Sequence, residues 1–424
     1  MAITTTSGHT LLTIVCEIDT SKRARLEKIL AEIRNDLSDN QYIPFPAIRL
    51  LHFASFVITR EESEPALLIF ENNFDGKWNP YLNELVECAG PGLHPIFECC
   101  IHYNSPHFHP VYLKRFLTKC TVRPNAYHIG NVGRAAGDIK MNQKLREHLQ
   151  TFLDDLFANA NPESFSPKDL RKRMQDYTRS LREPDYLKQL PPRQKFLEIV
   201  VPKFLKLFFF ALTVVLALGF LPVSIILLLI LRKKEKNDPV DTVHPSLSKV
   251  DHLMNSENRI TQNHLANITE IKPGWFRLTL LRAVLFFTNL LARTSTQGKL
   301  SDISSIHFAH WSIINDGKHL LFLSNYDGSW ASYLDDFIDK ASSGLTGIWS
   351  NTKGFPLTRY LVRDGASDEI PFKAFARNHQ VQSLVWYSTY PDLTVQNIDK
   401  DSMIRENLFK ALDDSEIQEW LKLF

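Results

Sequence analysis

A histidine and an aspartate recur at matching places in the two halves of the chain. His52 lies in LHFASF and His307 lies in the similar string IHFAHW, and the strings NFDG and NYDG, which hold Asp75 and Asp327, follow them. A histidine close to an aspartate can act as a general base whose ring the carboxylate orients. An aspartate–glycine pair at the end of a strand also suits a turn or a helix N-cap, and this structural role is the competing interpretation.

Polar residues that occur in only one copy are the stronger candidates for a site, because a duplicated protein commonly specialises one half. In the second half, Arg359 follows a Gly–Phe–Pro turn, where a guanidinium can hold a carboxylate or a propionate through two parallel hydrogen bonds. His310 and His379 are also specific to this half. The candidate catalytic residues are therefore His307, His310, Asp327 and Arg359, and the candidate cofactor-binding residues are Arg359, Arg363 and His379.

Common catalytic and metal-binding motifs are missing from the sequence. There is no HExxH, CxxC, P-loop, GxGxxG or GxSxG string, and we assign no metal ligand. His107 and His109 could form a metal pair, but lone surface histidines are commoner. All five cysteines lie in the first half, and this odd count predicts free thiols in a reducing compartment: Cys16, Cys88, Cys99, Cys100 and Cys120.

The match between the halves extends well beyond these strings and indicates an internal duplication. LNELVECAGPGL (82–93) aligns with LDDFIDKASSGL (334–345), and NQKLREHLQTFLDD (142–155) aligns with DSMIRENLFKALDD (401–414). A period of this length is far too long for a solenoid. It predicts two related globular modules that pack as a pseudo-dimer.

Hydrophobic periodicity predicts the same order of elements in each half. In the first half we expect strands at 11–18, 50–58, 66–70 and 96–102, with helices at 22–36 and 78–88. This βαββαβ order is the ferredoxin-like pattern. A helix (111–119), a strand (near 125–129) and a long helix (139–157) follow, and the second half repeats the series.

A long apolar run separates the two halves. Residues 207–231 contain no charged side chain, and about 20 apolar residues suffice to cross a bilayer core. Both flanks are basic, which is typical of the cytoplasmic side of a membrane. A single crossing would put the halves on opposite sides, and Gly219 and Pro222 interrupt the run. We therefore favour a re-entrant hairpin over a single span.

One further segment of the second half suggests contact with lipid. Residues 275–293 are nearly all apolar, whereas the matching segment of the first half is an amphipathic helix. Such a helix is either deeply buried or lies in a lipid interface, and we favour the interface.

These patterns divide the 424 residues into five segments. They are module 1 (1–158), a charged linker (159–203), a transmembrane or re-entrant segment (204–232), a polar linker (233–262) and module 2 (263–424). The net charge of +2 argues against a nucleic-acid partner. The first residues lack the pattern of a secretory signal peptide.

The tandem βαββαβ modules resemble the dimeric α/β-barrel superfamily, in which two ferredoxin-like sheets face each other around a pocket. The strings IHFAHW, FLSNYDGSWASYLDDFID and GFPLTRYL are also similar to a group of bacterial membrane-associated proteins. Haem-binding relatives in the superfamily include the dye-decolourising peroxidases, whose distal motif is GxxDG. Its nearest counterparts here are NNFDG (72–76) and SNYDG (324–328).

Together these observations predict an α+β protein at the cytoplasmic face of a membrane. Two tandem ferredoxin-like modules would form a pseudo-dimeric α/β barrel with an inserted membrane segment. We expect it to bind, or to oxidise, a lipophilic or haem-type ligand in a pocket between the repeats. The resemblance implies a peroxidase-like oxidoreductase if the protein is an enzyme. The alternative is a non-catalytic membrane-bound scaffold, and the expected partners are the bilayer and further copies of the chain.

Overall fold

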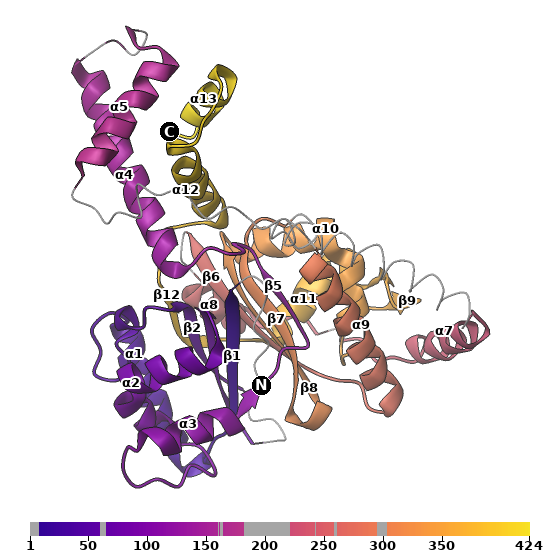
Figure 1. Cartoon of the computed structure of the whole chain (residues 1–424). Coiled ribbons are helices and arrows are strands. Elements are labelled where there is room, and N and C mark those ends of the chain that lie inside the picture. The colour runs from indigo at the N-terminus through magenta and orange to yellow at the C-terminus, as the bar shows by residue number, and fades with distance from the viewer. Residues whose placement is uncertain are drawn as a thin grey trace.

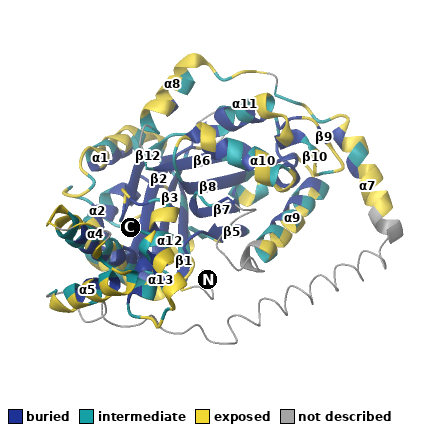
Figure 2. Ribbon diagram, turned by 90° about the horizontal axis from the view of Figure 1, so that it is seen from above, coloured by how far each residue is buried: buried dark blue, intermediate teal, exposed yellow. Residues whose placement is uncertain are grey.

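The computed structural model describes residues 8–59, 65–159, 161, 164–181, 221–241, 243–257, 261–294 and 303–424. Within these residues the chain forms two five-stranded antiparallel sheets with helices on their outer faces (Figure 1). The mixed α+β class expected from the sequence is confirmed. Figure 2 shows that the strands hold most of the buried residues, while the helices expose one face each.

The first sheet has the strand order β12-β2-β3-β1-β4. Three helices cover its outer face, and their apolar sides join the sheet in one core that includes Leu26 of the first helix and Leu85 of the second. The strands are β1 (His9–Glu17), β2 (Leu51–Ile58), β3 (Leu67–Asp75), β4 (Thr121–Val122) and β12 (Ser383–Ser388), and the helices are α1 (Arg23–Asn35), α2 (Trp78–Phe97) and α3 (Pro110–Lys119).

The second sheet has the strand order β11-β6-β8-β7-β5 and a core of its own on its outer face. Read in reverse, as β5-β7-β8-β6-β11, this order matches the first sheet strand by strand when strands are counted along each half. The strands are β5 (Ala126–Ile129), β6 (Gln262–Glu270), β7 (Ile306–Ile314), β8 (His319–Asp327) and β11 (Gln380–Val381), and the helices are α9 (Trp275–Thr294), α10 (Trp330–Trp349) and α11 (Glu369–His379).

Each sheet receives one edge strand from the other half of the sequence. Strand β12 pairs with β2, with Trp386 opposite Ser55, and strand β5 pairs with β7, with Tyr127 opposite His310. The segments 1–158 and 263–424 therefore describe the duplication in the sequence, but neither forms a complete sheet by itself.

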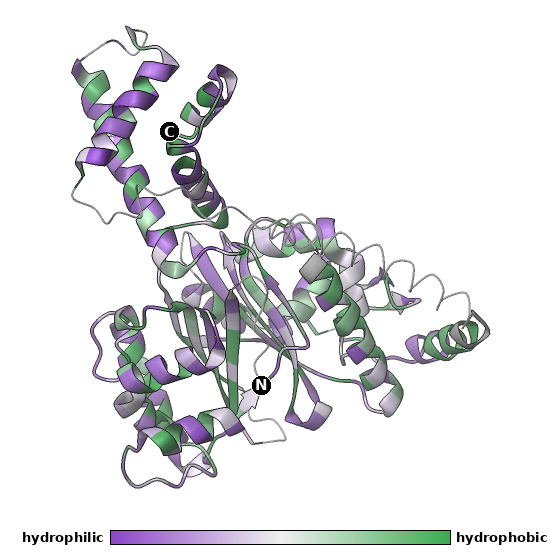
Figure 3. Cartoon of the chain, viewed as in Figure 1, coloured by the Kyte–Doolittle hydropathy of each residue, from purple (hydrophilic) through white to green (hydrophobic). Residues whose placement is uncertain are grey.

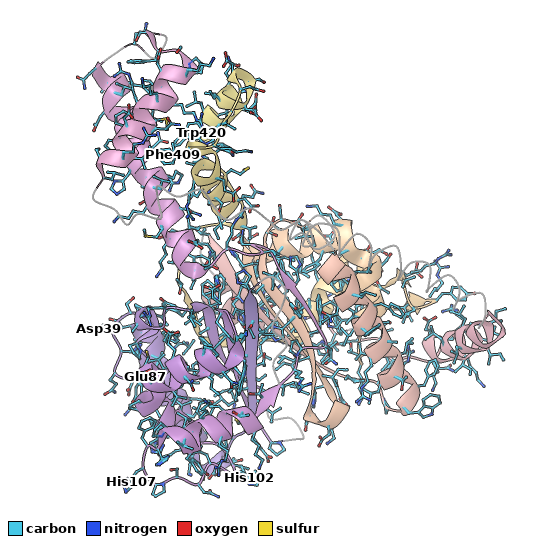
Figure 4. The ribbon with its side chains drawn as sticks, viewed as in Figure 1. Asp39, Glu87, His102, His107, Phe409 and Trp420 are labelled. Carbon is cyan, nitrogen blue, oxygen red and sulfur yellow. The ribbon has the colours of Figure 1, made fainter. Side chains whose placement is uncertain are left out.

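Four helices project from one end of the sheets (Figure 1, upper left). They enclose a separate apolar cluster that includes Leu149, Met174 and Trp420. Phe409 and Trp420 lie on its inner side in Figure 4. The helices are α4 (Ala136–Asn159), α5 (Pro167–Ser180), α12 (Val395–Leu408) and α13 (Asp414–Leu421), so α5 lies within the segment expected to be a linker.

Two further helices belong to the segment that joins the halves, α7 (Leu221–Glu235) and α8 (Leu247–Ser256). The second half also contains a hairpin formed by β9 (Thr358–Arg359) and β10 (Arg363–Asp364). Among the described residues, no helix has the length and apolarity needed to cross a bilayer. The expected membrane segment, 204–232, lies outside the described residues as far as residue 220.

One expected strand is wrong. Residues 96–102 do not form a strand, because α2 continues to Phe97 and the edge strand of the first sheet is Thr121–Val122. The glycines near the end of α2 allow close packing, since a Cβ on Gly92 would lie 1.8 Å from the carbonyl oxygen of Tyr42.

Candidate functional site

The space between the two sheets is lined by buried ionisable side chains. Such side chains are rarely fully buried unless they are paired, and they concentrate at functional sites. Glu71 from the first sheet is 1% exposed, and no histidine of the group is more than 7% exposed. The histidines are His9, His52, His264, His307 and His310.

A first cluster surrounds Asp75 at the end of β3. Its Oδ1 lies 2.9 Å from His52 Nε2 and 3.1 Å from His9 Nδ1, and its Oδ2 accepts the backbone N–H of Ala136 at 2.8 Å. The other ring nitrogen of His52, Nδ1, lies 2.7 Å from the hydroxyl of Tyr390. The cluster thus connects β1, β2 and β3 of the first half with Tyr390 of the second half and with the first residue of α4.

The second half repeats the central part of this cluster. Nε2 of His307 lies 2.7 Å from Oδ1 of Asp327, whose Oδ2 accepts the backbone N–H of Val395, the first residue of α12, at 2.8 Å. The histidine–aspartate pairing proposed from the sequence therefore exists in both halves. Gln262 stands where the first half has His9, so only the first half has a second histidine on its aspartate.

The two aspartates hold helices, although not the helices expected. The helices that directly follow them, α2 and α10, begin after Lys77 and Ser329, and Ser329 caps α10 with its own hydroxyl. Asp75 and Asp327 bind instead the first residues of α4 and α12, which lie 61 and 68 residues further along the chain. The structural role is thus long-range, and it fixes the two projecting helices to the ends of the sheets.

Proton positions in the first cluster follow from its hydrogen bonds. The backbone N–H of Gly133 donates to His9 Nε2 at 3.0 Å, so in neutral His9 the proton sits on Nδ1 and faces Asp75. Burial favours the neutral form of Asp75, but its bonds to His52 and His9 outweigh this and hold the pKa of Asp75 well below its usual range. Burial also lowers the pKa of His52, with the contact to Asp75 partly opposing it. These two shifts favour an ionised Asp75 beside a neutral His52.

A second cluster surrounds Glu71, which precedes Asp75 on β3 and lies on the same face of that strand. Oε2 of Glu71 lies 3.1 Å from His264 Nε2, and Oε1 lies 3.3 Å from His310 Nδ1. Both histidines belong to the second sheet, so the carboxylate of one sheet is held between two rings of the other. Ser55 and Asn73 complete its shell, with donor–acceptor distances of 3.2 Å and 3.1 Å.

The Glu71 cluster has no counterpart in the other half. The residue matching Glu71 on β8 is Leu323, and the residue matching His310 on β2 is Ser55. Burial alone would raise the pKa of Glu71, yet the hydrogen bonds of His264 and His310 hold it well below its usual range. His310, a candidate catalytic residue specific to one copy, thus lies in the cluster that is itself unique.

A small cavity lies between the two clusters. His9, Asn73, Phe308 and His310 help to line it, and its volume is about 20 Å³, which is room for about one water molecule. Pockets for organic cofactors measure about 300–1,000 Å³. This cavity between the sheets does not fit haem.

The expected cofactor-binding residues lie away from this interior. Arg359 is exposed on the β9–β10 hairpin, where it forms an ion pair with Asp364, and Arg363 is exposed on the same hairpin. His379, at the end of α11, bonds the carbonyl oxygen of Phe375 and lines a separate groove. The structure does not bring these three residues together with His307, His310 and Asp327.

The suggested HFH pair lies far from the sheet interior as well. His107 is exposed at the outer edge of the first half (Figure 4). His109 caps the N-terminus of α3, where its Nδ1 accepts the backbone N–H of Tyr112 at 3.3 Å. His109 Nδ1 is therefore already used as a helix cap, while His107 is exposed to solvent.

The groove next to His379 is larger than the cavity between the sheets, and residues of both halves line it. Its volume is about 820 Å³, and Trp275, at the exposed N-terminus of α9, stands at its edge. Apolar, basic and acidic side chains share the lining. The apolar members include Leu67, Ile268, Leu278 and Ile314, the basic members include Lys272, Lys318 and Lys353, and the acidic members include Asp241 and Glu270.

One side of the second half exposes a large apolar surface, which we call the α7–α9 face. It consists of outward residues of α7, of α9 and of the β9–β10 hairpin, which lie next to one another in Figures 1 and 2 and are strongly apolar on the helices in Figure 3. Its large exposed apolar residues are Ile225, Ile226, Leu227, Leu228, Leu229, Ile230, Trp275, Phe286, Phe287, Leu291, Leu357, Tyr360 and Val362.

No match to the chain was found among protein-family models, curated proteins or solved structures.

Sequence reasoning missed four members of the interior clusters: His9, Glu71, His264 and Tyr390. A usable signal existed for Glu71, because it directly follows the apolar run ALLIF (66–70). It also lies on the same face of the strand as Asn73 and Asp75, two and four residues before them. His9 and His264 lie on the two equivalent first strands, but a single histidine near the start of a strand carries little information.

Proposed function

We propose that the protein works at a membrane surface, where the α7–α9 face rests on the bilayer. The observation that carries this proposal is α7, in which six consecutive large apolar residues, 225–230, are exposed, Leu229 to 65%. Soluble proteins rarely expose a contiguous apolar surface of this kind, and such surfaces mark membrane or partner contacts. Helix α7 also continues the apolar run 207–231 of the sequence.

Helix α9 supports the same orientation. Its first residue, Trp275, is 77% exposed, and Leu291, near its other end, is 69% exposed. A helix with one face packed on a protein and aromatic or leucine side chains on the other is suited to lie in the plane of a lipid interface. The cation–π contact of Lys234 with Phe276 places the end of α7 beside the start of α9.

Basic residues border the apolar surface, and this charge pattern favours anionic lipid. Arg359 and Arg363 extend from the hairpin between its exposed apolar residues, so these two candidate residues acquire a role as lipid-headgroup ligands. Each basic residue near an anionic leaflet contributes about 1 kcal/mol to binding. The other basic residues at this border are Arg232, Lys233, Lys234 and Lys236.

The groove next to Trp275 has the volume and lining for an amphiphilic ligand. Its volume of about 820 Å³ falls in the range of small-molecule sites. Apolar side chains such as Leu278 suit a hydrocarbon tail, and Lys318 suits an anionic head. Because Trp275 belongs both to the groove and to the α7–α9 face, a ligand can pass from the bilayer into the groove. We therefore propose that the lipophilic ligand expected from the sequence binds in this groove and not between the two sheets.

In fold terms, we propose that the halves are two ferredoxin-like modules that form one pseudo-dimeric α/β barrel. The common strand order of the two sheets and their facing inner sides support this assignment. The exchange of β5 and β12 supports placing both modules on the same, cytoplasmic side of the membrane, because strands of one sheet cannot lie on opposite sides of a bilayer.

Vesicle flotation tests the membrane proposal. We expect the full chain to float with vesicles of phosphatidylcholine and phosphatidylglycerol, and more weakly with phosphatidylcholine alone. Exchanging Phe286, Phe287 and Leu291 together for serine should reduce binding to both vesicles, whereas Arg359→Ala with Arg363→Ala should reduce it only for the anionic ones. Val111→Ser, at an exposed apolar residue on α3, is the matched control. Equal flotation of all variants would contradict the proposal.

The ligand is tested separately, by mass spectrometry of lipids that co-purify with the protein. We expect a bound anionic amphiphile whose amount falls in Lys318→Glu, while flotation of that variant on phosphatidylcholine is unchanged. Flotation without any bound amphiphile would favour the second candidate function, a membrane-bound scaffold. The exposed α7–α9 face supports that alternative equally, and only the groove distinguishes the two.

A further inference from the structure

We propose that His9, His52 and Asp75 form a binding site for one divalent transition-metal ion. The three ligand atoms, His9 Nδ1, His52 Nε2 and a carboxylate oxygen of Asp75, all lie within 4.8 Å of one another. Oδ1 of Asp75 is 3.1 Å from the first and 2.9 Å from the second. This inference is independent of the proposed membrane function.

The distances suit three ligands on one face of a metal ion. Nitrogen and oxygen ligands bind zinc and similar ions at about 2.0–2.2 Å. Two such ligands at a right angle are therefore about 3 Å apart, which is the spacing of both nitrogens from Asp75 Oδ1. Two imidazoles with one carboxylate favour Zn²⁺, Fe²⁺ or Co²⁺ over Mg²⁺ and Ca²⁺, which prefer all-oxygen sites.

The surroundings of the three residues match those of a metal site. Metal-bound histidines usually have a hydrogen-bond partner on the other ring nitrogen, and bound carboxylates are themselves hydrogen-bonded. His52 Nδ1 meets the Tyr390 hydroxyl, and the second oxygen of Asp75 accepts the N–H of Ala136. The cavity lined by His9 and His310 adjoins the cluster and has room for a water molecule as an exchangeable ligand.

Metal binding has to change one hydrogen bond in this structure. The N–H of Gly133 donates to His9 Nε2, so the ring proton of His9 occupies the nitrogen that would bind the ion. On binding, that proton moves to Nε2 and the bond to Gly133 is lost. Gly133 has a positive φ of 78°, and glycine can adopt backbone conformations closed to other residues, which permits its peptide to turn. Affinity should also fall at acid pH, because protonated ligands do not bind metal.

The second half of the chain provides a matched comparison within the same molecule. His307 and Asp327 reproduce the pair formed by His52 and Asp75, but Gln262 replaces the third ligand. The pair is therefore common to both halves, and His9 is the addition that would make one of them a metal site.

Metal titration of the full chain tests the site. The protein is purified in detergent without a histidine tag, treated with a chelator and titrated anaerobically with Zn²⁺, Fe²⁺ or Co²⁺, and bound metal is measured by elemental analysis after desalting. We expect one equivalent, ligand-field absorption bands with Co²⁺, and no comparable retention of Mg²⁺. His9→Gln should weaken binding by about 100-fold or more, and His307→Gln should retain one equivalent.

A gain-of-site variant keeps the test independent of any effect of His9→Gln on folding. Gln262→His completes the same ligand set in the second half, so the stoichiometry should rise to two, with doubled Co²⁺ absorption. The proposal is overturned if the wild-type chain retains no transition metal, if His9→Gln binds as tightly as wild type, or if Gln262→His stays at one equivalent.

Discussion

Trp386 donates its indole N–H to the side-chain carbonyl oxygen of Asn325 at 2.7 Å, and both residues are buried. Trp386 lies on β12 in the first sheet, and Asn325 lies on β8 in the second, so this hydrogen bond crosses the interior between the sheets. Because β12 comes from the second half of the sequence, the bond also fixes an exchanged strand to the sheet of its own half.

Removing this donor should destabilise the protein measurably. Trp386→Phe keeps an aromatic ring but leaves the amide oxygen of Asn325 buried without its partner, which costs about 1–3 kcal/mol. Urea unfolding followed by circular dichroism should show the lower free energy of unfolding. Trp275→Phe, at an exposed tryptophan, is the control and should leave the midpoint unchanged. Equal midpoints for all three proteins would refute the prediction.

Both aspartates should contribute to stability, whether or not Asp75 also binds a metal ion. Asp327→Ala removes the acceptor for the N–H of Val395 and should lower the free energy of unfolding by about 0.5–2 kcal/mol. Asp75→Ala should cost more, because Asp75 also has two histidine partners. Thermal melts measure both, with Asp39→Ala, at an exposed residue of the first half (Figure 4), as the control. An unchanged melt for Asp327→Ala would mean that the duplicated turn serves a purpose other than holding α12.

Glu71 should make stability depend on pH in the acid range. Its pKa in the folded protein is held below the ordinary value of 4.5, so its ionised form stabilises the fold. That contribution is complete above the ordinary pKa and is lost as the pH falls below it. The difference in unfolding free energy between wild type and Glu71→Gln should be largest near neutral pH and should shrink between about pH 5 and pH 3.

Urea titrations at a series of pH values measure this difference. Glu87→Gln, at an exposed glutamate on α2 (Figure 4), should show no such trend relative to wild type. A constant difference between wild type and Glu71→Gln across the whole range would be inconsistent with an ionised Glu71.

Both ends of the chain should lie on the same side of the membrane. The halves share strands in both sheets, so the segment between them has to return to the side from which it starts. Reporter fusions at Met1 and at Phe424 in intact cells should both give the cytoplasmic signal. Reporters on opposite sides would rule out the re-entrant topology and would be incompatible with the exchanged strands.

Local patterns predicted most of the strands and helices, because alternation of apolar residues and helical spacing are properties of short segments. The strand 50–58 and the helix 139–157 lie within two or three residues of β2 and α4. The end of α2 was mispredicted, because the helix continues through Gly92 to Phe97. Gly92 packs closely against the backbone of Tyr42, a contact that no local pattern reveals.

The interior site was predicted only in part, because most of its contacts are between the halves. The histidine–aspartate pairs could be proposed because His52 and Asp75 lie on neighbouring strands of one hairpin. The contact of Glu71 with His264 joins residues 193 positions apart on different sheets. Arg359 was selected for its chemistry, but its hairpin faces outward, and chemistry alone does not give orientation.

The exchange of edge strands also determines when the first sheet can be completed during synthesis. His52 on β2 and its partner Tyr390, just after β12, are 338 residues apart in the chain. At about 5–20 residues per second, β2 waits roughly 20 to 70 s on the ribosome before its neighbouring strand is made. During that interval the rest of the first half and the apolar run 207–231 are synthesised. The first half therefore leaves the ribosome with its sheet still open at one edge, and that sheet is completed only after β12 has been made.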